Sequence, residues 1–134
     1  MKDNVRHLLH EHGIRPSAHR LAVAEYVLET KEHPSADKVW KTVAGTFPAI
    51  SRATVYNTLN LFVEKGLLRE VHLSADSVVF DGKLEHHHHF IDEKSGAIYD
   101  VDFDRVQVCN IESLSSEFDI HDYQVVMRGR KTGA

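Results

Sequence analysis

The chain has 134 residues, 42% of them hydrophobic and 27% charged, a composition ordinary for one soluble domain or two small ones. Because it has no run of about 18 apolar residues and no signal-peptide core, we expect a cytoplasmic protein that neither spans a membrane nor is secreted. The one cysteine, Cys109, excludes a disulfide within the subunit and a zinc site built of cysteines alone. We expect Cys109 to be a buried helix residue.

The net charge of −4 is distributed unevenly along the chain. Residues 1–72 carry ten lysines and arginines against eight aspartates and glutamates, a net charge of +2, whereas residues 73–134 carry six against twelve, a net charge of −6. The slightly basic first part favours a polyanionic partner, and the acidic, histidine-rich second part favours a cation. The basic excess is too small to establish nucleic-acid binding by itself.

Three helices are predicted in the first third of the chain. The first covers residues 2–12 and stops at Gly13, a residue suited to the left-handed conformation that follows a helix. The second and third begin after Ser17 and Ser35, because serine is a preferred N-cap residue and apolar side chains follow at helical spacing. Pro34 predicts the loop between them.

A fourth helix, residues 52–65, is predicted after the N-cap Ser51, and a hairpin follows it directly. The hairpin is predicted from strand-forming residues at 67–73 and 78–80, joined by a turn at 74–77. Short helices, the last of them capped by serine and followed by a hairpin, describe a winged helix-turn-helix.

The polar face of helix 52–65 suits DNA recognition. Arginine can contact guanine, asparagine can contact adenine, and tyrosine or threonine can contact the thymine methyl group. Their position in the N-terminal turns fits a helix that enters the major groove end-first. A solvated amphipathic helix explains this segment equally well taken alone, but the preceding helices and the hairpin favour DNA. The candidate contacts are Arg52, Thr54, Tyr56, Asn57 and Asn60.

The second part of the chain has a different pattern, and residues 80–85 are the expected hinge. We predict an α+β protein, with a winged-helix domain in residues 1–82 and a smaller α/β domain in residues 83–134. The elements predicted in the smaller domain are strands at 87–92 and 97–101, a helix at about 104–118 and a strand at 123–129.

Residues 86–89 are four consecutive histidines. On a strand, His87 and His89 point to one face, while the other two point away. Asp81 precedes His87 at an even spacing, and Asp100 can return on a paired strand, so two imidazoles and two carboxylates can meet. That set suits divalent iron, manganese or zinc. An expression tag is excluded by the patterned sequence that follows; a solvated polar turn stays open.

Four segments, residues 15–20, 33–36, 51–59 and 64–68, carry a specific combination of motifs. Together with the histidine-rich strand and Asp100, they resemble the ferric uptake regulator family over nearly the whole chain. The family's members are homodimeric, metal-responsive transcriptional regulators, usually repressors, with a winged helix followed by an α/β dimerisation domain. The resemblance implies operator DNA as a partner and no enzymatic activity, and it adds Arg15 and Ser51 to the candidate DNA contacts.

The resemblance also implies a complete metal site, in which Fe(II) or Mn(II) binds and Zn(II) can substitute. It adds His33, a residue that strand spacing could not supply. A metal held by both halves of the chain would fix the angle between the winged helix and the dimer core, and so select the spacing that DNA requires. The ligands implied by position are His33, Asp81, His87, His89 and Asp100.

Two departures from the family pattern affect further metal sites. Many members hold a structural zinc with two pairs of cysteines, but Asp92 and Ser95 stand where the first pair belongs, so we predict no structural cysteine zinc. A second family site matches His86 and His88 on the other strand face. Tyr123 stands where its last histidine is expected. The substitutes that this chain offers are Glu117 and His121.

The aspartate at position 100 resembles the peroxide-sensing branch of the family. That branch implies an Fe(II) site whose reaction with hydrogen peroxide oxidises a ligand histidine, here His33 or His87. The rival is the iron-response-regulator branch, which also lacks the cysteine pairs, has a histidine run and binds haem. Its N-terminal cysteine-containing haem motif is absent here. The peroxide-sensing interpretation is therefore preferred, with an iron- or haem-responsive regulator as the alternative.

Two other classes of protein could contain the histidine run. A metalloenzyme would need an open coordination position and a general acid or base such as Glu85. The sequence shows no set of residues arranged to activate a nucleophile. A metal-buffering protein would explain the histidines but not the base-reading face of helix 52–65. Both are weaker than the regulator.

Overall fold

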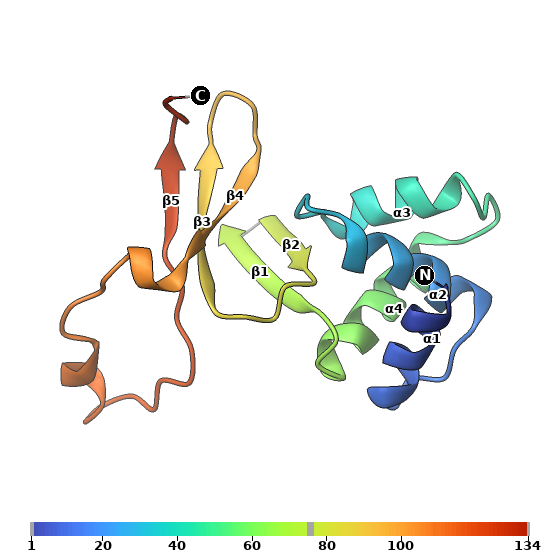
Figure 1. Ribbon diagram of the computed structural model, residues 1–134, viewed down its shortest axis with the longest axis horizontal. Helices are drawn as coiled ribbons and strands as arrows, with labels where there is room; N and C mark the ends of the chain where they lie inside the picture. The colour runs from blue at the N-terminus through green and yellow to red at the C-terminus, as the bar shows by residue number, and fades with distance from the viewer. Residues whose placement is uncertain (1, 75–76, 134) are drawn as a thin grey trace. The chain divides into compact units, whose positions relative to one another are not determined.

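The computed structural model describes residues 2–74 and 77–133, and the chain divides into two compact units, residues 1–84 and 85–134 (Figure 1). Four helices and two small sheets make up the described part, so the predicted α+β class is confirmed. None of the helices in these ranges is both long and apolar enough to cross a membrane.

The first unit contains the four predicted helices. Three serines cap them as predicted: the side chains of Ser17, Ser35 and Ser51 each accept a hydrogen bond from the backbone N–H three residues later. Gly13, just beyond the first helix, has a φ of +72°, which glycine adopts without strain. The helices are α1 (Lys2–Glu11), α2 (Ala18–Glu29), α3 (Ala36–Ala44) and α4 (Arg52–Glu64).

One hydrophobic core holds these helices together, and α4 packs into it through Val55, Leu59 and Phe62, which are fully buried. Thr58 is also buried on this face, and it donates its hydroxyl hydrogen to the Thr54 carbonyl 2.7 Å away. Because α4 buries one face so completely, its opposite face is held at the surface of the unit.

The predicted hairpin follows α4 as β1 (Arg69–Ser74) and β2 (Ser77–Asp81), which pair antiparallel (Figure 1). Two residues of the predicted turn, 75 and 76, lie outside the described residues. Val71 and Val79 face each other in the register and are buried. The first unit is therefore a winged helix, as the sequence predicts.

The second unit has a three-stranded sheet, in the order β4-β3-β5 (Figure 1). The central strand β3 (His87–Asp92) pairs antiparallel with β4 (Ile98–Asp102) and parallel with β5 (Val126–Gly129). The first two strands agree with the predicted ranges to within a residue. The third is shorter than predicted, because β5 begins at Val126 and residues 123–125 before it are not part of the strand.

The prediction of a helix at about 104–118 is wrong. Within residues 103–125, all of them described, the structure has only two 3-10 turns, η1 (Phe103–Arg105) and η2 (Ile111–Leu114). Asn110 is left-handed, with a φ of +66°, and interrupts the segment. The hydroxyls of Ser113 and Ser115 donate to backbone carbonyls three residues earlier, which competes with helix formation.

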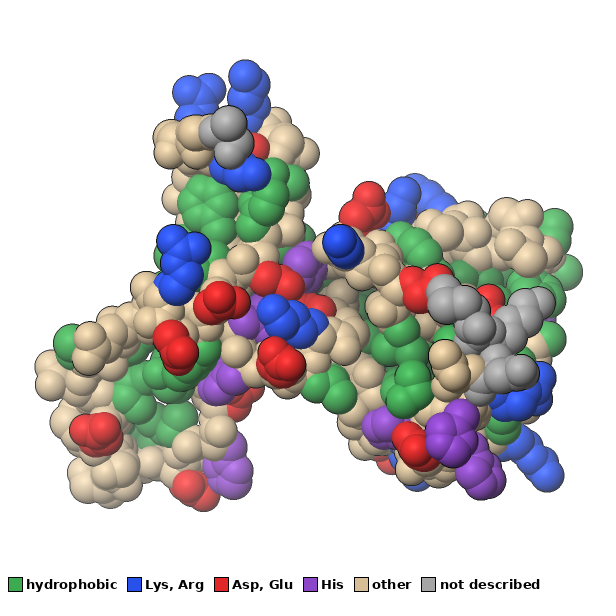
Figure 2. Space-filling view, viewed as in Figure 1, with side chains coloured by type: hydrophobic (Ala, Val, Ile, Leu, Met, Phe, Trp, Pro, Cys, Tyr) green, Lys and Arg blue, Asp and Glu red, His purple; other side chains and the backbone are tan. Residues whose placement is uncertain are grey.

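Without that helix, the segment exposes apolar side chains, and hydrophobic surface is visible on the second unit in Figure 2. Cys109 is exposed and lies outside any helix, contrary to the expectation that it is a buried helix residue. The exposed large hydrophobic residues of this segment are Val108, Leu114, Phe118 and Ile120.

Candidate metal-binding and DNA-binding sites

The central strand β3 brings three candidate metal ligands together in the second unit. Its side chains alternate, and Asp100 lies directly opposite His89 in the pairing with β4. One oxygen of Asp100, Oδ1, lies 3.3 Å from Nε2 of His87 and 3.6 Å from Nε2 of His89. Both histidines are buried, at 1% and 0% exposure. Two imidazole nitrogens and one carboxylate oxygen therefore converge on one point.

The far side of each ring fixes which nitrogen can bind a metal. Nδ1 of His87 lies 2.6 Å from the carbonyl oxygen of Glu85, and Nδ1 of His89 lies 3.0 Å from Oε1 of Gln124. Both partners are acceptors, so each Nδ1 carries the proton and donates it. In the neutral form of each ring, the lone pair is then on the Nε2 that faces Asp100, the arrangement typical of metal-binding histidines. The donor set fits a divalent transition metal.

Two more candidate ligands lie together in the first unit. Nε2 of His33, in the α2–α3 loop, lies 3.3 Å from Oδ2 of Asp81, at the end of β2. The side chains of both residues are at most 9% exposed. The Phe80 N–H donates to the carbonyl of Pro34 at 2.9 Å, so the loop and the strand are joined beside the pair.

The turn after Asp81 depends on glycine. The Lys83 N–H donates to Oδ1 of Asp81 at 2.9 Å, which leaves Oδ2 facing His33. A Cβ at Gly82 would lie 3.1 Å from the Val27 carbonyl and 3.3 Å from Leu28 Cδ2, closer than ordinary contacts. Gly82 lets the backbone pass against α2 and so holds Asp81 in place, which no spacing in the sequence revealed.

The other face of β3 carries an aromatic stack. The rings of His86 and His88 stack on Phe103, at centroid distances of 4.3 and 4.8 Å. Nε2 of His86 contacts the carboxylate of Asp122 and the carbonyl of Tyr123. These contacts occupy His86 with partners other than the predicted ligands.

His88 has the opposite tautomer to its neighbours. Its Nδ1 accepts the Val125 N–H at 2.9 Å, so the proton is on Nε2, which is buried with no hydrogen-bond partner in the described ranges. Burial, and secondarily the nearby His86, hold the pKa of His88 below its ordinary value. A protonated Nε2 cannot ligate a metal.

The structure does not gather the proposed second set of ligands, His86, His88, Glu117 and His121, among the residues it describes. His121 instead contacts Asp119 at 2.9 Å, and both side chains are highly exposed. As arranged here, this donor set does not fit a metal.

Asp92 and Ser95, at the positions of the family's first cysteine pair, form a closed turn after β3. The Ser95 hydroxyl donates to Asp92 Oδ2 at 2.8 Å, and the Lys94 N–H donates to Oδ1 at 3.1 Å. These hydrogen bonds, the hydroxyl's first, hold the pKa of the Asp92 carboxyl below its ordinary value. Hydrogen bonds between residues of this turn, and no cysteine ligands, therefore hold it together.

The predicted DNA contacts lie on the exposed face of α4 and before it. Arg52, Tyr56, Asn57 and Asn60 are exposed, and Tyr56 is 42% exposed although it is a large aromatic residue. Thr54 is half-buried, and its hydroxyl is 2.9 Å from that of the N-cap Ser51. Arg15 is exposed in the α1–α2 connection. The sequence did not reveal that Arg52 also contacts Asp37 of α3.

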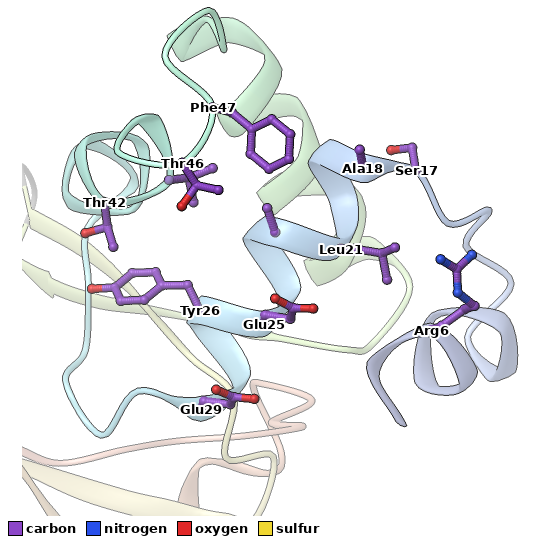
Figure 3. A pocket seen from close by; sticks show the side chains of 12 residues that line it. Arg6, Ser17, Ala18, Leu21, Glu25, Tyr26, Glu29, Thr42, Thr46 and Phe47 are labelled. Atoms are coloured by element: carbon purple, nitrogen blue, oxygen red, sulfur yellow. The ribbon is translucent and has the colours of Figure 1, made fainter. Parts of the chain in front are cut away.

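The first unit also has a cavity of about 600 Å³, lined by residues of α1, α2, α3 and the α3–α4 connection. Figure 3 shows Glu25, Tyr26 and Glu29 extending from α2, with Phe47 and Thr46 from the α3–α4 connection. Oε1 of Glu25 is buried and has no hydrogen-bond partner among the described residues. None of these residues was singled out by its sequence pattern.

Comparisons with known proteins agree with this architecture. The model of the ferric uptake regulator family matches residues 11–128. The peroxide-responsive repressor PerR of Staphylococcus epidermidis is 33% identical over 124 residues, which cover 90% of this chain and 81% of that protein. PerR of Staphylococcus aureus strain Mu50 is 34% identical over 124 residues, with 90% and 82% covered.

Solved structures show the same fold. The ferric uptake regulator of Vibrio cholerae superposes with a TM-score of 0.74 at 23% identity, covering 94% of this chain and 98% of that one. PerR of Streptococcus pyogenes superposes with a TM-score of 0.54 at 31% identity, covering 97% and 90%. With the family model matching most of its length, this chain belongs to the ferric uptake regulator family.

Proposed function

We propose that this chain is a metal-dependent, DNA-binding transcriptional repressor whose regulatory site senses hydrogen peroxide. The observation that carries the proposal is the pair of histidines on β3 whose Nδ1 atoms are held by Glu85 and Gln124 while both Nε2 atoms face Asp100. Metal-binding histidines usually donate the N–H of their other ring nitrogen to an acceptor that fixes the tautomer, as both histidines do here.

We propose His33 and Asp81 as the remaining ligands of the same ion. Their pairing within the first unit, together with the positions they occupy in the family's motifs, supports this assignment. Three imidazoles and two carboxylates suit Fe(II) or Mn(II), with Zn(II) as a substitute. An ion held by residues of both units would restrict how they move, and so favour the arrangement of recognition helices that binds operator DNA.

Peroxide sensing is supported by the similarity to peroxide-responsive repressors and by the aspartate at position 100. Fe(II) held in this site would activate hydrogen peroxide, so that one peroxide oxygen would add to a ligand imidazole and the other would leave as water, with peroxide as the two-electron oxidant. His33 and His87 are the residues we expect to be modified. An oxidised ring donates its lone pair poorly, so the chain would lose the metal and then the DNA.

The DNA-binding surface proposed here is the exposed face of α4, together with its N-cap Ser51 and with Arg15 of the α1–α2 connection. Tyr56, Asn57 and Asn60 have side chains that can read base edges, and they are exposed because α4 buries its other face. Repressors of this kind bind as dimers to paired half-sites, and we propose a homodimer formed through the second unit, whose 103–125 segment exposes apolar side chains.

Anaerobic DNA binding measured with Fe(II) or Mn(II), before and after brief peroxide treatment, tests this function. The DNA would be selected from a random-sequence pool with the Mn(II)-loaded protein. We expect peroxide to abolish binding in the Fe(II) sample alone, with a gain of roughly 16 Da, one oxygen atom, on the peptide of His33 or His87. Unchanged Fe(II)-dependent binding with unmodified histidines would contradict peroxide sensing and leave a metal-level regulator.

A haem-responsive regulator is the second candidate, because the second unit has a cavity of about 610 Å³ lined by His86, His121 and Tyr123. Imidazole and phenolate are ligands of haem iron, and Ile111, Phe118 and Ile120 supply an apolar wall. Haem titration followed by visible spectroscopy tests it. A saturable haem spectrum that is lost in His121→Ala would favour this candidate; free-haem spectra throughout would remove it.

A further inference from the structure

Arg52, the first residue of α4, is held by α3 in this structure. Its guanidinium Nη1 is in hydrogen-bond contact with Oδ1 of Asp37, and its Cζ lies 4.3 Å from the centroid of the Trp40 ring. The tryptophan is itself fixed, because its Nε1–H donates to the Ile50 carbonyl at 3.0 Å. A carboxylate and an aromatic face thus hold a cation that would otherwise face DNA.

Asp37 has a second cation within reach. Nζ of Lys41, one helical turn further along α3, lies 3.2 Å from its Oδ2. If Arg52 moves away, the carboxylate of Asp37 therefore keeps a partner. The exchange leaves no buried unpaired charge, since the side chains of Asp37 and Lys41 are 37% and 64% exposed.

The strength of the Asp37–Arg52 pair suits a reversible contact. The Arg52 side chain is 56% exposed, and an exposed ion pair changes an equilibrium by at most about fivefold, whereas a bidentate arginine–guanine contact discriminates by about 5- to 150-fold. A matching base can therefore take Arg52 from Asp37. Without one, Arg52 remains neutralised and contributes no phosphate contact.

We propose that Asp37 is a specificity-determining residue: it withholds Arg52 from non-specific DNA and releases it to a matching base. The inference rests on the proposed DNA-binding function. Non-specific binding is almost entirely electrostatic, so withholding one cation weakens it directly. Specific binding recovers the loss through the base contact, and Asp37 raises the ratio between the two.

The test compares Asp37→Asn with the wild type on two duplexes, one of random sequence and one selected by the wild-type protein from a random pool. Affinities would be measured with Mn(II) from 50 to 200 mM salt. We expect Asp37→Asn to bind the random duplex more tightly and with a steeper salt dependence. One added phosphate contact corresponds to an extra weakening of about threefold over that range. Binding to the selected duplex should change less.

Two controls assign the effect to Arg52. Glu64→Gln, at the far end of α4, removes the same charge from the same unit and should leave the salt dependence unchanged. Arg52→Gln combined with Asp37→Asn should return the salt dependence to that of the wild type. A thermal melt of each variant checks that the winged helix stays folded.

The outcomes separate this inference from the proposed function. If Asp37→Asn leaves the non-specific salt dependence unchanged, or weakens both duplexes equally, Asp37 is a structural brace and the inference is overturned. If the wild type selects no sequence at all from the pool, the DNA-binding function itself fails.

Discussion

Asp100 Oδ1 lies 3.3 Å from His87 Nε2 and 3.6 Å from His89 Nε2, so one carboxylate oxygen faces two histidines of the neighbouring strand. The antiparallel register places Asp100 opposite His89, and the strand period of two places His87 on the same face. One carboxylate oxygen thus completes a donor set that two imidazole nitrogens begin.

Asp100→Asn should lower Mn(II) affinity by at least tenfold, because an amide oxygen is a weaker and uncharged donor in nearly the same shape. Isothermal titration with Mn(II) measures the change. Asp104→Asn, at an exposed position in η1 after β4, removes the same charge, and we expect its affinity to stay within about twofold of the wild type. Equal affinity in both variants would show that Asp100 is not a ligand.

Gln124→Leu should weaken metal binding without removing any ligand. The amide Oε1 of Gln124 accepts the Nδ1–H of His89 at 3.0 Å and so keeps the lone pair on Nε2. Losing such a partner usually costs about 10–100-fold in metal affinity. Gln107→Leu, at an exposed position in the same unit, is the matched control for competition titrations with a chromogenic chelator. A Gln124→Leu affinity equal to that of the control would contradict this role.

The strand positions of the candidate site could be predicted because β-structure has a strict period. Once residues 87–92 are a strand, the face that holds His87 and His89 follows, and a turn at Gly96 brings Asp100 back beside them. The three serine caps were predictable for a similar reason, since each depends only on residues within one helical turn.

Gln124, Gly82 and Asp37 could not be predicted, because their roles depend on contacts between distant segments. Gln124 reaches His89 from 35 residues away, and Gly82 matters only because α2 passes beside it. The wrong helix at 104–118 has the same origin. Its apolar spacing was present, but local serine hydrogen bonds and the left-handed Asn110 prevail where the chain offers that helix nothing to pack against.

Gly82→Ala should destabilise the first unit. The added Cβ would lie 3.1 Å from the backbone carbonyl of Val27, and backbone cannot move aside as a side-chain end can. Overpacking of this kind costs about 1–3 kcal/mol. Gly129→Ala is the matched control, since its Cβ would meet the Phe90 ring at 3.6 Å, an ordinary contact. Chemical denaturation measures the free energy of unfolding of both variants. Equal stabilities would show that α2 can shift to accommodate the added Cβ.

Glu25→Met should stabilise the first unit, because it removes a carboxylate oxygen that is buried without a hydrogen-bond partner among the described residues. Methionine has a similar length and helix propensity, so the gain, of order 1 kcal/mol, comes from the relieved desolvation. Glu29→Met, one turn further along the same face of α2 but at an exposed position, should change little. Unfolding free energies of the two variants provide the comparison, and a less stable Glu25→Met would mean that water or an ion satisfies this oxygen.

Phe118→Asp should weaken dimerisation through the second unit. Phe118 is 58% exposed in the single chain, and burying a phenylalanine contributes about 1.5–3 kcal/mol, so its loss should raise the dimer dissociation constant at least tenfold. We also expect less helical circular dichroism, because a partner surface is what the predicted 104–118 helix lacks in the single chain. Ser116→Asp, an exposed polar neighbour, controls for the added charge. Sedimentation velocity measures the assembly.

If both variants dimerise like the wild type, the 103–125 segment is not the interface. If Phe118→Asp alone becomes monomeric and loses helix signal, folding of this segment is coupled to assembly.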